Sequence, residues 1–209
     1  MRTIEQTVFK FSELTDTAKE KAREWWRTTT DIDLDHVIDD SATVAAIFGL
    51  DIRKKTVRLM GGRTREEPQV YWSGFWSQGD GASFEGDYTY CKGALDAVKS
   101  YAPQDAQLHA IVRRLQRVQA RNFYRLTAGA YKSNHHCCHE MTMRIDVSRT
   151  DDAPVSDDDA EELSDCLRDF ARWIYRALET EWEYLASDES IDDLMECNGY
   201  EFDEEGRIV

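Results

Sequence analysis

The sequence has no long apolar run. No stretch approaches the roughly 18 consecutive apolar residues that a transmembrane helix needs. The opening residues, Met1-Arg2-Thr3-Ile4-Glu5, also lack the apolar core of a signal peptide. We therefore expect a protein that does not enter membranes and that works in the cytoplasm.

The sequence also lacks the usual motifs of metal, cofactor and catalytic sites. The phosphate-binding patterns GxxxxGK[ST] and GxGxxG are missing, and no Ser-His-Asp or Cys-His arrangement stands out. No zinc-finger or Cys-x-x-Cys spacing occurs, so free thiols in a reducing compartment are expected. The cysteines are Cys91, Cys137, Cys138, Cys166 and Cys197. These absences favour a non-enzymatic protein without a cofactor, and make a hydrolase or nuclease the weakest interpretation.

Lysine is absent after Thr150. From there to the end, 21 Asp and Glu stand against 4 Arg, whereas residues 1–149 hold 20 acidic and 22 basic side chains. The net charge of −15 therefore belongs to the last third of the chain. Such a field repels nucleic acid and membranes and attracts basic protein surfaces, which makes direct nucleic-acid binding unfavourable. Simple solubility is the alternative explanation.

An aromatic stretch from Val70 to Tyr90 is the densest structural signal. Aromatic residues alternate with small or polar ones, which is typical of strands, and Gln78-Gly79-Asp80-Gly81 is a turn signal. The stretch predicts a β-hairpin inside the sheet, covered by helices. At least two of its bulky rings are expected to be buried, and Trp72→Ala or Trp76→Ala to cost about 3–5 kcal/mol. The rings considered are Trp72, Phe75, Trp76 and Phe84.

Helical and strand patterns are grouped along the chain rather than strictly alternating. Helices are expected at 18–27, 36–48, 91–101, 104–122, 156–186 and 187–197. Strands are expected at 2–11, 51–60, 123–132 and 140–147, with a terminal hairpin at 200–209 and a loop at 61–68. This order predicts an α+β fold with a mainly antiparallel sheet, packed by several helices including a long acidic C-terminal helix. We expect a single domain over 1–209, with a sheet-containing part (1–149) and an acidic helical part (150–209) as a subdivision.

The acidic region supplies the first candidate site. Carboxylates on helix faces can imitate DNA phosphates and occupy a basic groove of a partner. Acids near helix N-termini also stabilise the helix through its dipole, which is the structural alternative. The candidate partner-binding residues are Asp157, Asp158, Asp159, Glu161, Glu162, Asp165, Asp188, Glu189, Asp192 and Asp193.

A glycine-rich turn and an arginine stripe supply the second candidate site. Backbone N–H groups of the turn would meet phosphates, the ring of Trp72, Trp76 or Tyr88 would stack on a base, and arginines would balance the charge. The residues are Trp76, Gly79, Asp80, Gly81, Arg113 and Arg117. A tight turn explains the glycines without a ligand. Ion pairing with the acidic segment, or solvation, explains the stripe of Arg113, Arg114, Arg117, Arg121 and Arg125.

The run His135-His136-Cys137-Cys138-His139 contains five residues that can ligate metals. Adjacent strand residues point to opposite faces, so at most His135, Cys137 and His139 would converge. No second ligand pair lies at a familiar spacing. A polar hairpin turn is therefore favoured over a metal site.

The run from Tyr71 to Gly86 resembles a family of uncharacterised proteins of tailed bacteriophages and prophages, some labelled antitoxins of toxin–antitoxin systems. The likeness continues at 101–105, 121–124 and 172–185, and so covers most of the chain. The resemblance implies an accessory protein acting in the cytoplasm of a host bacterium. It supplies no catalytic residues.

Charge and resemblance together lead to two functional hypotheses. In the first, the protein inhibits a host defence factor or toxin through its acidic surface, as an anti-CRISPR or antitoxin-like DNA mimic. Its partner would be a bacterial protein with a basic surface. In the second, the protein is a sponge for a nucleotide immune signal. The sequence leaves open whether the protein forms a homodimer.

Overall fold

The computed structural model describes residues 6–133 and 137–209 and divides the chain into two compact units. Unit 1 combines residues 1–34 with 180–209, and unit 2 holds residues 35–179. The boundaries therefore lie at 34/35 and 179/180, whereas the sequence suggested a subdivision at 149/150. The second boundary falls within the long helix α5 (Asp157–Leu185), most of which belongs to the sheet-containing unit. In the described part of the chain, no helix is both long and apolar enough to cross a membrane.

Unit 1 is a small unit built around two helices. Its elements are β1 (Phe9–Lys10), η1 (Phe11–Glu13), α1 (Asp16–Thr29), α6 (Asp188–Asn198) and β10 (Glu201–Phe202). Ala18, Ala22 and Trp26 recur every fourth residue and bury one face of α1 against Ile191 and Met195 of α6.

Capping and an ion pair complete unit 1. The Thr15 side chain accepts a hydrogen bond from the N–H of Ala18 and so starts α1. The Arg23 guanidinium donates two hydrogen bonds of 2.7 Å to the Asp192 carboxylate, which ties α1 to α6. Short strands β1 and β10 pair antiparallel beside the helices.

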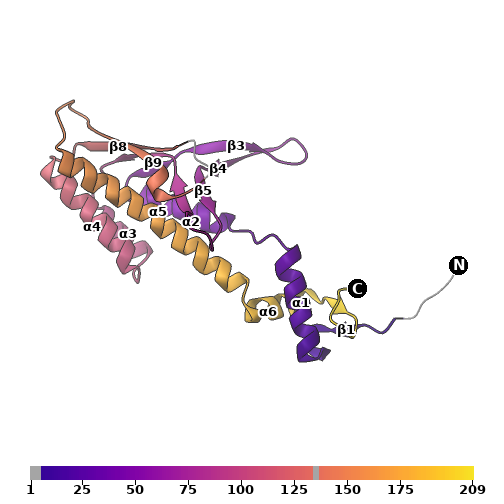
Figure 1. Ribbon diagram of the computed structural model, residues 1–209. Coiled ribbons are helices and arrows are strands. Elements are labelled where there is room, and N and C mark those ends of the chain that lie inside the picture. Colours follow the sequence, from indigo (N-terminus) through magenta and orange to yellow (C-terminus); the bar gives the residue numbers. More distant parts are fainter. Residues whose placement is uncertain (1–5, 134–136) are drawn as a thin grey trace. The chain divides into compact units, whose positions relative to one another are not determined.

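Unit 2 contains the main sheet (Figure 1). Its elements are α2 (Asp35–Ile47), β2 (Leu50–Ile52), β3 (Lys54–Arg58), β4 (Thr64–Pro68), β5 (Val70–Ser73), β6 (Gly81–Phe84), β7 (Gly86–Thr89), α3 (Ala94–Tyr101), α4 (Ala106–Arg121), β8 (Leu126–Lys132), η2 (Glu140–Thr142), β9 (Met143–Arg149) and most of α5. Strands β2, β7, β8 and β9 form an antiparallel sheet in that order, while β3–β4 and β5–β6 are separate antiparallel pairs. The predicted α+β class is thereby confirmed, including the antiparallel sheet and the long C-terminal helix.

Helices α4 and α5 lie side by side and antiparallel in unit 2 (Figure 1). Leu108, Val112 and Leu115 bury the predicted stripe of α4. Phe170, fully buried on α5, contacts the rings of Phe48 and Phe84 edge-on at 4.9 and 5.9 Å. This aromatic cluster joins α5 to the end of α2 and to the β5–β6 pair, and its burial contributes several kcal/mol.

A three-way backbone junction explains why the strands change partners. The N–H of Arg53 donates to the carbonyl of Glu85, that of Glu85 to Gln69, and that of Gln69 to Arg53, at 2.8, 3.0 and 2.7 Å. Three antiparallel strand pairs meet at this junction, namely β2 with β7, β3 with β4, and β5 with β6. The strand expected at 51–60 is therefore split at Arg53.

Two other expectations differ from the structure. The segment expected as a loop at 61–68 contains β4, because its residues complete a hairpin with β3. Of the strand expected at 2–11, only Phe9–Lys10 is extended and paired within the described residues. The hairpin of β5 and β6 forms as predicted, but as its own pair beside the four-stranded sheet rather than within it.

Candidate functional site

The loop between β5 and β6 is fixed by Asp80. Its carboxylate accepts hydrogen bonds from the N–H groups of Trp76 and Ser77, at 3.0 and 2.6 Å. The N–H of Asp80 in turn donates to the Ser77 carbonyl at 3.0 Å. Gly79 has φ of 101°, which favours glycine and supports the turn explanation of this residue. Asp80 is thus a structural acceptor, and its carboxylate is already engaged.

The aromatic rings of this hairpin are buried less than expected. Phe84 is fully buried, but Trp72 and Phe75 are half-buried and Trp76 is 76% exposed. The expectation of at least two buried rings is therefore wrong. Trp72 and Phe75 stack on one another at 5.2 Å between centroids, so they shield each other at the surface instead of entering the core.

The segment from Cys137 to His139 passes over the hairpin. A Cβ added to Gly81 would lie 3.1 Å from the Cα of His139, so a larger residue at this position would require the segment to shift by a few tenths of an ångström. The Nδ1 atom of His139 accepts a hydrogen bond from the N–H of Met141 at 3.1 Å. Among the described residues, no three side chains are placed to hold a metal ion, and His135 and His136 lie outside the described residues.

The arginine stripe of α4 divides into two sets. Arg114 donates to Glu162 of α5 at 2.8 Å and also contacts Asp169, and Arg121 donates to Asp159 at 2.7 Å. Arg113 and Arg117 are exposed and form no ion pair within the described residues. The predicted ion pairing with the acidic segment thus holds for the arginines that face α5, and leaves two guanidinium groups without a counter-charge.

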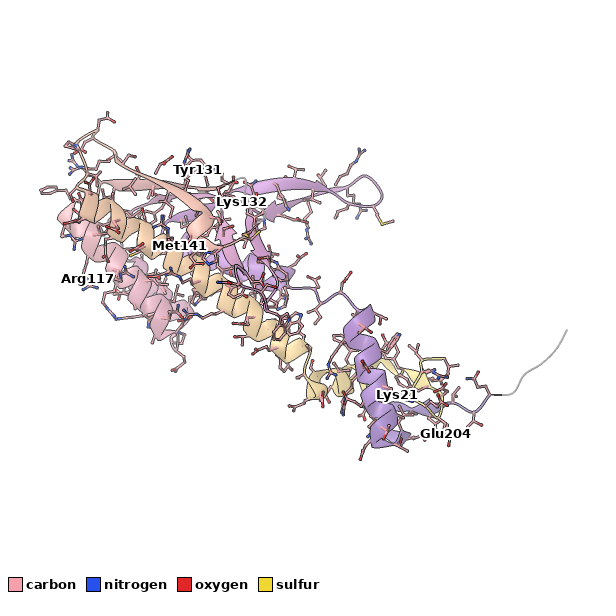
Figure 2. All side chains as sticks on the ribbon, in the orientation of Figure 1. Lys21, Arg117, Tyr131, Lys132, Met141 and Glu204 are labelled. Atoms are coloured by element: carbon pink, nitrogen blue, oxygen red, sulfur yellow. The ribbon has the colours of Figure 1, made fainter. Side chains whose placement is uncertain are left out.

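Those two arginines line an open cleft of about 300 Å³, here called the arginine cleft. Its lining residues are Tyr90, Arg113, Gln116, Arg117, Ala120 and Tyr124. The rings of Tyr90 and Tyr124 lie 4.6 Å apart between centroids and are tilted by 37°. Arg117 projects from α4 (Figure 2). The cleft therefore combines unpaired positive charge with an aromatic wall.

The turn that carries Tyr124 has an unusual backbone. Phe123 and Tyr124 have φ of 55° and 62°, in the left-handed region that bulky residues rarely adopt. Both side chains are exposed, so burial does not compensate for this strain. Strained backbone of this kind is concentrated at functional sites. The strain places the Tyr124 ring against that of Tyr90.

Buried amides hold this turn in place. The N–H of Tyr124 donates to the Gln119 carbonyl at 2.7 Å. The amide of Asn122 donates to Val118 and to Asp159, at 3.0 and 2.9 Å. Burial alone would raise the pKa of Asp159, but the hydrogen bonds from Asn122, Arg121 and Ser156 outweigh it and lower the pKa. The carboxylate therefore stays charged and fixes the end of α4 against the start of α5.

The predicted ligand residues do not form one site. Arg113 and Arg117 line the arginine cleft, but Trp76, Gly79, Asp80 and Gly81 do not. The hairpin loop instead contacts Tyr175, whose hydroxyl donates to the Gly74 carbonyl at 3.0 Å. Sequence reasoning named Tyr88 as a stacking residue, but Tyr88 is buried. It missed Tyr90 and Tyr124, although Tyr90 ends the aromatic stretch of residues 70–90 and Tyr124 belongs to the aromatic pair that follows α4.

Half of the predicted acidic partner-binding residues are used internally. Asp159, Glu162, Asp165, Asp188 and Asp192 pair with Arg121, Arg114, Arg168, Arg23 or Arg27. The others form no ion pair within the described residues; they are Asp157, Asp158, Glu161, Glu189 and Asp193. The first three lie at the start of α5 and the last two on α6 in the other unit.

Comparison with known proteins identifies the family. Residues 34–188 match a domain of unknown function (DUF8835), and the chain belongs to this family. The match includes all of unit 2 and extends over α5. Searches of curated proteins and of solved structures gave no match.

Proposed function

We propose that the protein is a binding protein and that the arginine cleft binds a compound with a phosphate group and a flat ring, such as a nucleotide. The observation that carries this proposal is the pair of unpaired guanidinium groups, Arg113 and Arg117, beside the Tyr90 and Tyr124 rings. Arginine forks match phosphate geometry and can bind it through two hydrogen bonds. An aromatic face stacks on a base and contributes roughly 1–3 kcal/mol.

The contrast between neighbouring arginines supports a binding role. Arg114 and Arg121 lie on the same helix and have acidic partners. Carboxylates abound in this chain, yet none neutralises Arg113 or Arg117 within the described residues. A volume of about 300 Å³ is at the lower end for small-ligand sites and suits one nucleotide unit. The strained turn at Tyr124 gives the aromatic wall a fixed position before a ligand arrives.

The phage resemblance suggests the biological setting of this ligand. A protein made in an infected bacterium that sequesters a nucleotide immune signal would act as a sponge in the host cytoplasm. Such a role needs binding but no catalytic residues. It also needs no cofactor.

The test is calorimetric titration of the full chain with mononucleotides, cyclic mononucleotides and cyclic dinucleotides. We expect at least one to bind, Arg113→Gln/Arg117→Gln to weaken it at least tenfold, and Tyr124→Ala to weaken it less. The matched control is Arg144→Gln, since Arg144 is an exposed arginine on β9. Absence of heat with every nucleotide at millimolar concentration would refute the proposal. Equal loss in the Arg144→Gln variant would also refute it.

A second candidate function is inhibition of a basic host protein through the acidic surface. Asp157, Asp158 and Glu161 favour it, because they form no ion pair within the described residues at the start of α5. Attraction of this kind would speed association and weaken with salt. The test is capture of host proteins by the wild type and by Asp157→Lys/Asp158→Lys/Glu161→Lys. Glu189→Lys/Asp193→Lys tests α6 separately. Capture that neither variant reduces at low salt would exclude the acidic-surface mechanism.

A further inference from the structure

The hairpin of β3 and β4 contributes little to the core. We call Lys54–Pro68 the β-arm; its base contacts α2, where Arg65 pairs with Asp35, and its tip extends away from the helices of unit 2 (Figure 1). Pro68, at its base, is the only one of its residues that is buried. At the tip, Met60 is fully exposed and Leu59 is 42% exposed. An isolated two-stranded ribbon is only marginally stable and buries little apolar surface, so the fold alone does not explain the β-arm.

Charge is unevenly distributed along the β-arm. Its acids, Glu66 and Glu67, lie near the base, where Glu67 pairs with Lys55 and Arg65 at 3.6 and 2.8 Å. The outer half, residues 57–64, contains two arginines and no acid. Arg58 and Arg63 are exposed and form no ion pair within the described residues. The tip of the β-arm is therefore cationic and apolar in an acidic protein.

The turn at the tip stands clear of the rest of the chain. The N–H of Leu59 donates to the Arg63 carbonyl at 2.7 Å, and that of Gly62 to the Leu59 carbonyl at 3.1 Å. Gly61 and Gly62 have φ of 97° and 83°. Apart from the glycine itself and its two neighbours in the chain, no described atom lies within 4 Å of the Cβ that either would carry. These bonds hold Leu59 and Met60 at the outermost point, with an arginine on either side.

We propose that the β-arm binds duplex nucleic acid, with Arg58 and Arg63 on backbone phosphates and Leu59 or Met60 against the bases. A two-stranded ribbon fits a groove of a duplex, and apolar side chains at such tips can wedge between base steps. Charge complementarity favours this partner, because the cations are flanked by no acid on the outer half. A lipid surface is disfavoured, since one Leu and one Met offer little apolar area for insertion.

The position of the acidic residues keeps this interaction possible despite the net charge of −15. Unit 1 carries 18 acidic and 7 basic side chains, whereas unit 2, with the β-arm, carries 23 and 19. The acidic excess is therefore concentrated in the unit without the β-arm. Binding rests on the two cations of the outer half, Arg58 and Arg63, and is salt-dependent.

Counterion release gives the expected magnitude. Two phosphate contacts predict a slope of about −1.8 in a plot of log affinity against log salt. Affinity would then fall roughly 12-fold between about 50 mM and about 200 mM salt. Removing one arginine would lower the slope by about 1. Removing the apolar tip would weaken binding without changing the slope.

The experiment is fluorescence anisotropy of a short labelled DNA duplex titrated with the full chain at the two salt concentrations. We expect binding at low salt, its loss in Arg58→Gln/Arg63→Gln, and weaker binding with an unchanged salt slope in Met60→Ser. Because these side chains are exposed, the variants should keep the wild-type circular dichroism spectrum. Arg144→Gln is the matched control and should bind like the wild type.

Three results would overturn the inference. One is absence of duplex binding at low salt, with RNA duplex as well as DNA. Another is wild-type affinity in the folded Arg58→Gln/Arg63→Gln variant. The third is binding to phosphatidylserine vesicles that is abolished by Arg58→Gln/Arg63→Gln, together with no binding to either duplex. The nucleotide titration of the arginine cleft is independent of all three outcomes, because Arg58 and Arg63 do not line that cleft.

Discussion

Replacing Gln119 should destabilise the end of α4 and the start of β8 together. Gln119 is fully buried, and its side-chain amide donates to the Leu126 carbonyl at 2.8 Å and accepts from the Leu126 N–H at 3.1 Å. The register of β7 and β8 ends at Thr89 and Thr127. The Gln119 amide therefore bonds backbone groups of β8 beyond the end of β7. Gln119→Leu keeps the approximate size of the side chain and removes both of these hydrogen bonds, together with a longer one of 3.4 Å that the amide donates to the Tyr88 hydroxyl.

The magnitude follows from the two backbone groups left unpaired. A buried donor or acceptor without a partner costs about 1–3 kcal/mol, so the pair should cost about 2–6 kcal/mol. For a chain of this size, each kcal/mol lowers the melting temperature by about 2–4 °C. We therefore expect a fall of roughly 4–24 °C.

The assay combines thermal unfolding by far-UV circular dichroism with amide hydrogen exchange at Leu126 and Tyr124. Hydrogen exchange should accelerate at both positions in Gln119→Leu. The Leu126 N–H loses its acceptor, and the Tyr124 N–H, which donates to the backbone carbonyl of Gln119, belongs to the same turn and should loosen with it. The control is Gln104→Leu, the same substitution at an exposed position. If Gln119→Leu melted within 2 °C of the control, with unchanged exchange at Leu126, the reasoning would be refuted.

Other substitutions and conditions give further expectations. Phe84→Ala, which creates a cavity at a fully buried position, should lower the free energy of unfolding by about 3–5 kcal/mol in chemical denaturation. Trp76→Ala should lower it by well under half of that, because the Trp76 side chain is exposed. Equal losses of stability in the two variants would contradict these burial assignments. Burial raises the pKa of Tyr88 and of Cys166 to about 12, so both favour the neutral form in the folded state. The stabilisation that these two neutral groups give the folded state is complete below about pH 9 and is lost as the pH rises toward 12. Cys166→Ala should delay the onset of this loss toward pH 10. A series of unfolding midpoints measured at increasing pH checks this, and a pH profile unchanged by Cys166→Ala would count against the prediction. Asp80→Ala should accelerate hydrogen exchange of the backbone amides of residues 76 and 77, because the Asp80 carboxylate is their hydrogen-bond acceptor, and should change the melting temperature little. Amides that stayed protected in this variant would show that another group holds the loop.

Periodicity predicted much of the fold because it depends on neighbours in sequence. The helices at 104–122 and 156–186 were expected from their apolar stripes and agree with α4 and α5. The β-arm was missed in part, since β4 is polar, exposed and stabilised by pairing rather than burial. No local pattern distinguishes a strand of this kind from a loop.

The candidate site was harder to predict because its parts are distant in sequence. Arg113 and Arg117 were identified, but only the positions of acids on α5 decide which arginines of the stripe remain unpaired. Tyr90 and Tyr124 come together across 33 intervening residues through the strained turn. The burial of Gln119 could not be predicted from the sequence either, because a polar residue on an amphipathic helix is ordinarily assigned to the solvent-exposed face.

The three-way junction at Arg53, Gln69 and Glu85 has an evolutionary consequence. Each residue satisfies one backbone donor and one acceptor of the other two, so the hydrogen bonding of the junction is closed on itself. The hairpins that leave it can then lengthen, shorten or change composition without disturbing the register of their neighbours. Insertions among relatives should therefore accumulate at the 59–63 and 74–80 tips, where new binding specificities can arise while the rest of the fold stays unchanged.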